Sequence, residues 1–295
     1  MTAVRISHRR SWPQALAGVA LAALAGTAAA HDTWFAPLPA AAGELRLALG
    51  TGDKFPLHEF TVGADHLARH GCAGPSGPVM PMTSVGATPT ALLLTAQAAP
   101  GGLSCWAQLL PFEIELPADK VRVYLDEINA PAAVRTAWAA MQARGQPWRE
   151  RYTKHARIEL AGASASAVRR SGMGMGMGMD MLLHAAPGPL RPGDEIDVQV
   201  LRDGRPLPGF AVQLRSELSP LGLWRQTDAD GRVRLRPPLP GRWLLRGTEL
   251  TPPAADTGHW EGRFVTLAFD VAPPASRAGA MTPPPATRGL ALAAP

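Results

Sequence analysis

The C-terminal part of the chain alternates apolar and polar residues over short runs. In EIDVQVL (195–201), Ile196, Val198 and Val200 are separated by polar residues, which is the period of a strand with one buried face. Asp203-Gly204 follows as a turn. The same alternation recurs at 210–214, 233–235, 243–245 and 265–271. Short strands at this spacing predict an immunoglobulin-like β-sandwich over residues 187–272.

Residues 31–186 are less regular but also rich in strand patterns. The expected strands are LRLAL (45–49), ALLLTA (91–96), CWAQLL (105–110), FEIEL (112–116), VRVYL (121–125) and ARIEL (156–160). We therefore predict an all-β protein made of two β-sandwich-like domains, 31–186 and 187–272, of which the second is immunoglobulin-like.

One short helix is expected within the first domain. Asn129 can cap it and Pro131 suits its first turn. A helical face is predicted by the spacing of Val134, Trp138 and Met141, and Gly145 can end the helix. This apolar face is interpreted as core packing.

Two segments outside the domains have compositions of their own. Residues 1–30 combine a positive start, a short apolar run and Ala28-Ala29-Ala30, which together predict an export signal peptide cleaved before His31. Arg9-Arg10 also loosely fits a twin-arginine signal. Residues 273–295 are rich in Pro and Ala without periodicity, which predicts a flexible tail. We expect a periplasmic protein, soluble and without a transmembrane segment.

Charge excludes one class of partner. The net charge of the chain is +5, and it becomes +2 without the three arginines of residues 1–30. The remaining basic residues are scattered, so no nucleic-acid partner is expected.

The two cysteines, Cys72 and Cys105, fit an oxidising compartment. An isolated pair outside the cytoplasm predicts one disulfide, which typically stabilises a protein by about 3–4 kcal/mol for a loop of this length.

The chemistry of His31 follows from its predicted position at the mature N-terminus. A free α-amine and the imidazole Nδ1 of the same residue can close a chelate ring on one divalent ion. Nickel, cobalt, copper and zinc all accept such nitrogen ligands, and protons compete with them as the pH falls. A histidine that falls at a cleavage site by chance is the alternative.

Other histidines could complete a metal site. His58, beside Glu59, is the second candidate ligand. His66 and His70 are four residues apart, and if the segment is extended they lie too far apart to share an ion. The isolated histidines, which we interpret as surface or hydrogen-bonded residues, are His155, His184 and His259.

A methionine-glycine run forms the second unusual stretch. Its alternating methionines are Met173, Met175, Met177, Met179 and Met181. Thioether sulfur selects Cu(I), and glycines allow a loop to wrap around an ion. A low-complexity surface loop without function is the alternative, and the favoured one.

Two further motifs bear on function. TDADG (227–231) is expected to be a hairpin turn, because the acidic positions of a calcium loop do not continue after it. The sequence contains no nucleophile elbow, phosphate loop, zinc-protease motif or Rossmann glycine pattern. We therefore expect a binding protein, not an enzyme.

Several segments together resemble the DUF4198 family, which is associated with NikM/NikK-like periplasmic components of nickel or cobalt uptake. They are AHDTWF (30–35), GDKFP (52–56), WRERYTKHARIEL (148–160), RPGDEIDVQVLRDGRPLPGFAVQL (191–214), TDADGRVRLRPPLPGRWLLRG (227–247) and RFVTLAFDV (263–271). The resemblance implies an all-β extracytoplasmic protein that presents a transition metal to a membrane metal-uptake transporter. Only His31 matches a family position expected to be a ligand. Glu249 stands where the family often has a histidine.

The expected cofactor is accordingly a divalent transition metal, nickel or cobalt, with copper as the alternative because of the methionine run. A scaffold or adhesion module that binds no metal is the second class of function.

Overall fold

The computed structural model describes residues 31–74, 78–99, 101–160, 177–184, 189–254 and 258–274. The expected signal peptide, and all but the first two residues of the expected tail, lie outside these ranges.

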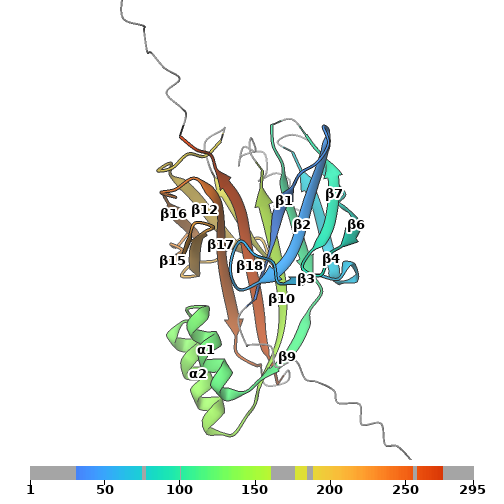
Figure 1. Cartoon of the computed structure of the whole chain (residues 1–295). Coiled ribbons are helices and arrows are strands. Elements are labelled where there is room, and N and C mark those ends of the chain that lie inside the picture. Colours follow the sequence, from blue (N-terminus) through green and yellow to red (C-terminus); the bar gives the residue numbers. More distant parts are fainter. Residues whose placement is uncertain are drawn as a thin grey trace, which may run out of the picture.

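The described residues form three sheets, and the central one is the largest (Figure 1). Its strand order is β15 (Ser219–Gln226), β14 (Ala211–Ser216), β17 (Gly241–Thr251), β18 (Trp260–Val271), β10 (Trp148–Glu159), β8 (Ser104–Leu109), β4 (Leu67–Ala73) and β5 (Val79–Met80), with β9 (Phe112–Leu116) also paired to β10. β10 and β18 run parallel, whereas the other neighbours are antiparallel. The sheet therefore joins strands from both sides of the boundary expected at residues 186 and 187.

Two smaller sheets accompany the central one. The first consists of β1 (Asp32–Leu38), β2 (Glu44–Gly52), β7 (Leu92–Gln97) and β6 (Thr83–Ala87), with β3 (Phe60–Thr61) paired to β2. The second consists of β11 (Met179–His184), β12 (Ile196–Arg202), β13 (Arg205–Pro206) and β16 (Arg232–Leu235).

The two smaller sheets cover opposite faces of the central sheet. Leu244 and Ala268 belong to the core shared with β1 and β2, whereas their neighbours Leu245 and Leu267 belong to the core shared with β11 and β12. Successive side chains of a strand point to opposite faces of the sheet, so β17 and β18 contribute side chains to both cores. The fold is all-β and sandwich-like, as the alternation predicts.

The segment VRVYL (121–125), expected to be a strand, is helical. It lies in α1 (Ala118–Glu127), which begins after Pro117. Val121, Tyr124 and Leu125 are buried and pack with Trp148 of β10. Spacings of three and four residues put these side chains on one helical face, and this burial outweighs the strand preference of valine and tyrosine. The prediction of a strand here, and of a single helix, is wrong.

The expected helix is α2 (Ala132–Ala143). Val134 and Trp138 are buried, and Gly145 follows the helix with a φ of 69°, a backbone conformation that glycine adopts freely. Asn129 does not cap it, because Pro131 occupies the N-cap position.

Two local predictions can be compared directly with the structure. Cys72 and Cys105 face each other across β4 and β8 and form a disulfide, as predicted. TDADG is a turn, in which Asp228 Oδ1 accepts hydrogen bonds from the amides of Asp230 and Arg232. It is not a hairpin, because β15 and β16 on either side belong to different sheets.

Within the described ranges, no helix has the length and apolar character that crossing a membrane requires.

Candidate metal centre

Strand pairing places two carboxylates beside His31. His31 directly precedes β1, and Asp32 pairs with Gly52 at the end of β2, so Asp53 follows on the adjacent strand. The chain then returns through β3, where Phe60 pairs with Thr51. The amide of Glu59 donates to the Thr51 carbonyl over 2.8 Å. Residues far apart in the sequence therefore meet at one end of the first sheet.

His31, Asp53 and Glu59 form the cluster at this end. Nε2 of His31 lies 3.4 Å from Asp53 Oδ1 and 3.7 Å from Glu59 Oε2. One potential ligand atom from each residue lies within 4.8 Å of the others. The three side chains are 20, 29 and 36% exposed, so the cluster is accessible from solvent. An imidazole and two carboxylates at these distances can hold a divalent cation.

Two arginines, the buried Arg246 and the half-buried Arg215, support the backbone on both sides of the cluster. Arg246 Nη1 donates to Asp32 Oδ2 over 2.8 Å, and Asp32 is only 2% exposed. Arg246 Nη2 also donates to the carbonyl of Glu127 at the end of α1. Arg215 Nη1 donates to the carbonyl of Asp53 over 2.8 Å. These contacts hold Asp32, which follows His31 in the chain, and the backbone of Asp53.

The local electrostatics favour a positive occupant. Burial raises the pKa of Asp53, and the neighbouring Glu59 and Asp32 raise it further, whereas His31 and Arg215 lower it. A cation that binds next to a carboxylate with a raised pKa stabilises its ionised form.

His58 does not join the cluster. Its ring packs against Trp34 with 4.8 Å between centroids, and its Nε2–H donates to the Trp34 carbonyl over 3.1 Å. Burial lowers its pKa to about 4. His58 therefore packs and hydrogen-bonds within the first sheet, and Glu59, its neighbour in the sequence, points to His31 instead.

The remaining histidines lie elsewhere. His66 is in the 3-10 helix η1 (Ala64–His66), and His70 in β4 has its Nε2 3.1 Å from the Met82 carbonyl. His155 in β10 is 1% exposed, and its Nδ1–H donates to Phe264. His259 Nε2 lies 2.8 Å from Glu261. His184 closes β11.

The described methionines of the run are buried, and the last two of them lie in β11. Met179 and Met181 are fully buried in the core between β11 and the central sheet, and Met177 packs against Ala73 and Trp106. Met173 and Met175 lie outside the described residues. A copper loop of five methionines does not fit the three described ones, because their sulfurs are enclosed by apolar side chains in two separate clusters.

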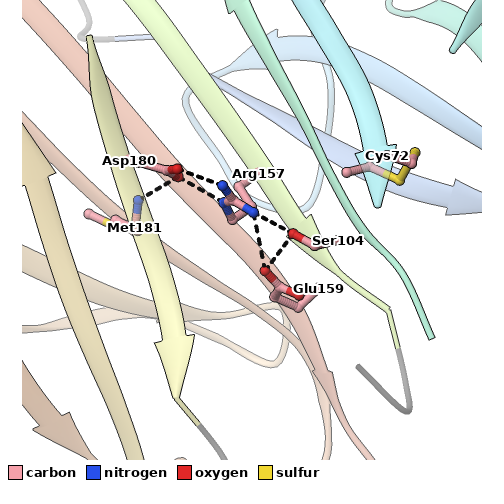
Figure 2. Close-up of polar contacts among 7 residues, drawn as sticks. Cys72, Ser104, Arg157, Glu159, Asp180 and Met181 are labelled. Atoms are coloured by element: carbon pink, nitrogen blue, oxygen red, sulfur yellow. Dashed lines mark hydrogen bonds and ion pairs between the residues drawn. A yellow bond between two sulfur atoms is a disulfide. The ribbon is translucent and has the colours of Figure 1, made fainter. Parts of the chain in front are cut away.

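A buried charge network fixes this strand against β10 (Figure 2). Arg157, which is 1% exposed, donates from Nε and Nη2 to the two carboxylate oxygens of Asp180 over 2.7 and 2.5 Å. Arg157 also donates to Ser104, whose hydroxyl donates to Glu159. Asp180 is flanked by Met179 and Met181, so the network positions both methionines in the core.

Glu249, at the position where a family histidine was expected, is not part of the cluster. Its Oε1 accepts a hydrogen bond from Arg202 Nη1 over 2.7 Å. Arg246 and Leu250 lie on the face of β17 that carries Asp32 and the helices, and the alternation of side chains puts Glu249 on the other face.

Asp53 and Glu59 are the site residues that sequence reasoning did not single out. Asp53 lies in the segment GDKFP, which contributes to the family resemblance, and Glu59 was noted only as the neighbour of His58. The pairing of β1 with β2 brings these residues to His31, and the local sequence does not specify that pairing.

Comparison with known proteins gives one match. The family model described as "Domain of unknown function (DUF4198)" matches residues 120–248. The match runs from α1 into β17 and supports the family expected from the sequence. It does not include the cluster of His31, Asp53 and Glu59, and its description names no metal. No match was found among curated proteins or among solved structures.

Proposed function

We propose that this chain, whose central region matches the DUF4198 model, is a periplasmic accessory protein that binds a divalent transition metal. It presents nickel or cobalt to a membrane uptake transporter. The cluster of His31, Asp53 and Glu59 is the observation that carries the proposal. The disulfide between Cys72 and Cys105 is compatible with export to an oxidising compartment.

The donor set decides between classes of metal. Imidazole suits nickel, zinc and cupric copper, and carboxylate oxygen adds affinity for harder divalent ions, whereas cuprous copper prefers thioether and thiolate sulfur. The cluster offers one nitrogen and two oxygens. Nickel and cobalt therefore fit it better than Cu(I), and Met179 and Met181 lie in the core of a different sheet pair.

The exposure of the cluster suits a carrier. Its side chains lie at the end of a sheet and remain partly accessible, so a metal bound there can pass to another protein. Binding and release require no chemical transformation, so the proposal assigns the protein a carrier role without an enzymatic step.

Calorimetric titration of the protein beginning at His31 with nickel, cobalt and zinc tests the proposal. His31→Ala is expected to lower nickel affinity by at least about tenfold, the loss that even outer residues of a metal site typically cause. His259→Ala is the matched control, since His259 lies outside the cluster and should leave affinity unchanged. Equal affinities in the wild type and His31→Ala would favour a scaffold or adhesion module without metal.

A further inference from the structure

A cleft of about 350 Å³ opens beside the cluster, between the first sheet and the central sheet. His31 and Phe60 line it from the first sheet, and Tyr152 and Lys154 line it from β10. Phe112 and His66, whose rings stack with 5.1 Å between centroids, form another wall. Pockets for small ligands typically measure roughly 300–1,000 Å³, so this cleft suits a small molecule.

Lys154 is the unusual residue of this cleft. It is only 8% exposed, yet it lines the open space. Within the part of the chain that the structure describes, no carboxylate lies within ion-pair distance of its ammonium group, which lies 5.8 Å from the Tyr152 ring centroid. Asp32 attracts Lys154 electrostatically, but its carboxylate already binds Arg246.

A buried ammonium without a bound anion is costly, and burial lowers the pKa of Lys154 to about 8. A divalent ion held by His31 would add a second positive charge at the same cleft. An anion placed between the two cations would compensate both, since it could bind the metal on one side and accept a hydrogen bond from Lys154 on the other.

We propose that this cleft holds a small carboxylate chelator that arrives with the metal, with its carboxylate bound by Lys154 and its remaining donors on the ion. The inference rests on the proposed metal site. The aromatic rings of Phe60, Phe112 and Tyr152 would cover the organic part of the chelator. The three residues of the cluster supply only three side-chain donors. The remaining coordination positions of the ion are therefore open to the donor atoms of the chelator.

Histidine and histamine are matched probes, because both chelate nickel through an amine and an imidazole and only histidine carries a carboxylate. Native mass spectrometry and calorimetry would follow the binding of preformed nickel–histidine and nickel–histamine complexes to the wild type. A ternary complex that retains histidine is expected, with affinity about tenfold or more above that of the histamine complex, since a charge-assisted hydrogen bond is lost in the latter. Equal binding of the two complexes would overturn the inference.

Lys154→Met should remove the preference for histidine over histamine while keeping the affinity for bare nickel. Lys120→Met, at an exposed position of α1, is the control and should keep the preference. The wild-type comparison of the two probes decides the matter if Lys154→Met fails to fold. Nickel binding that depends on His31 but retains no histidine would sink this inference alone, whereas the absence of any nickel binding would sink the proposed function as well.

Discussion

Arg246 donates to Asp32 across 2.8 Å in the interior, at the point where β1 begins and where the preceding residue is His31. The pair lies between the core of the first sheet and the cluster of helices α1 and α2, because Arg246 also reaches the carbonyl of Glu127. The cluster of His31, Asp53 and Glu59 is therefore anchored to a polar layer inside the fold and not to a surface loop alone.

Arg246→Met should destabilise the protein strongly. It leaves the Asp32 carboxylate buried without its main partner, and breaking a buried ion pair on one side typically costs about 3–5 kcal/mol. Urea unfolding would measure the change in the free energy of unfolding. Arg149→Met, which breaks the exposed pair with Glu115, should cost less than about 1 kcal/mol. Similar losses for both variants would contradict the anchoring role.

Asp53→Asn and Glu59→Gln should each weaken nickel binding without unfolding the protein. Both changes keep the size of a partly exposed side chain and remove the negative charge that attracts the ion. Calorimetry should show a loss for each and a larger loss for the double variant. Glu115→Gln, at an exposed position of β9, should bind nickel as the wild type does. Unchanged affinity in the double variant would remove the carboxylates from the site.

The methionine run gives a contrasting prediction. Leucine at 177, 179 and 181 should leave cuprous binding unchanged, because these side chains are buried among apolar residues. Such volume-conserving changes should each cost less than about 1.5 kcal/mol of stability. A competition assay with a cuprous chelator measures the binding. Met173→Leu with Met175→Leu is the complementary variant, and a loss of cuprous binding confined to the buried set would contradict the packing role.

Glu150 should make stability fall with rising pH. Burial raises its pKa from 4.5 to about 7, although Tyr124 and Trp148 donate hydrogen bonds to it. Between these values the folded protein holds a proton that the unfolded chain has released, so the free energy of unfolding decreases as the pH rises. Glu150→Gln removes this contribution, which amounts to at most about 1.4 kcal/mol per pH unit.

The measurement is the free energy of unfolding of wild type and Glu150→Gln at several pH values between these limits. Their difference should change with pH, in the direction that favours the variant at the higher pH. Glu159, whose pKa burial also raises to about 7, titrates in both proteins and cancels in the comparison. Parallel curves would show that Glu150 is ionised throughout.

The strands were predictable where one face is buried against a core. Ile196, Val198 and Val200 alternate because β12 has one face on the second core, and the sequence contains that alternation directly. The helix α1 was not predictable in this way, since Val121 and Leu125 satisfy both a strand period and a helical one. Packing against Trp148 of β10 and Trp260 of β18 decides between the two.

The candidate site likewise contains one residue that the local sequence indicates and two that only the fold brings to it. His31 could be found from its place after a predicted cleavage site, which is a local feature of the sequence. Asp53 and Glu59 depend on the pairing of Asp32 with Gly52 and of Thr51 with Phe60, which no local pattern specifies. Likewise, the parallel pairing of β10 with β18 joins segments on both sides of the expected domain boundary.

Either nitrogen of the His31 imidazole could hold a bound ion. In the structure Nε2 faces Asp53 and Glu59, whereas a chelate with a free α-amine would use Nδ1. Adding one alanine before His31 converts that amine into an amide, which is a poor donor, and leaves both carboxylates and the imidazole in place. If the ion lies between Nε2 and the carboxylates, nickel affinity of the extended protein should stay close to that of the protein beginning at His31.

Calorimetry of the native and extended proteins at the same pH provides the test, with His31→Ala as the reference for loss of the site. Loss of affinity on extension, to the level of His31→Ala, would assign the ion to the amine and Nδ1. Asp53 and Glu59 would then accept a hydrogen bond from Nε2–H and orient the ring, as carboxylates commonly do for metal-bound histidines. The two arrangements also differ in proton release, because only the chelate displaces a proton from the amine when the metal binds. Titration in two buffers with different ionisation enthalpies would detect that proton.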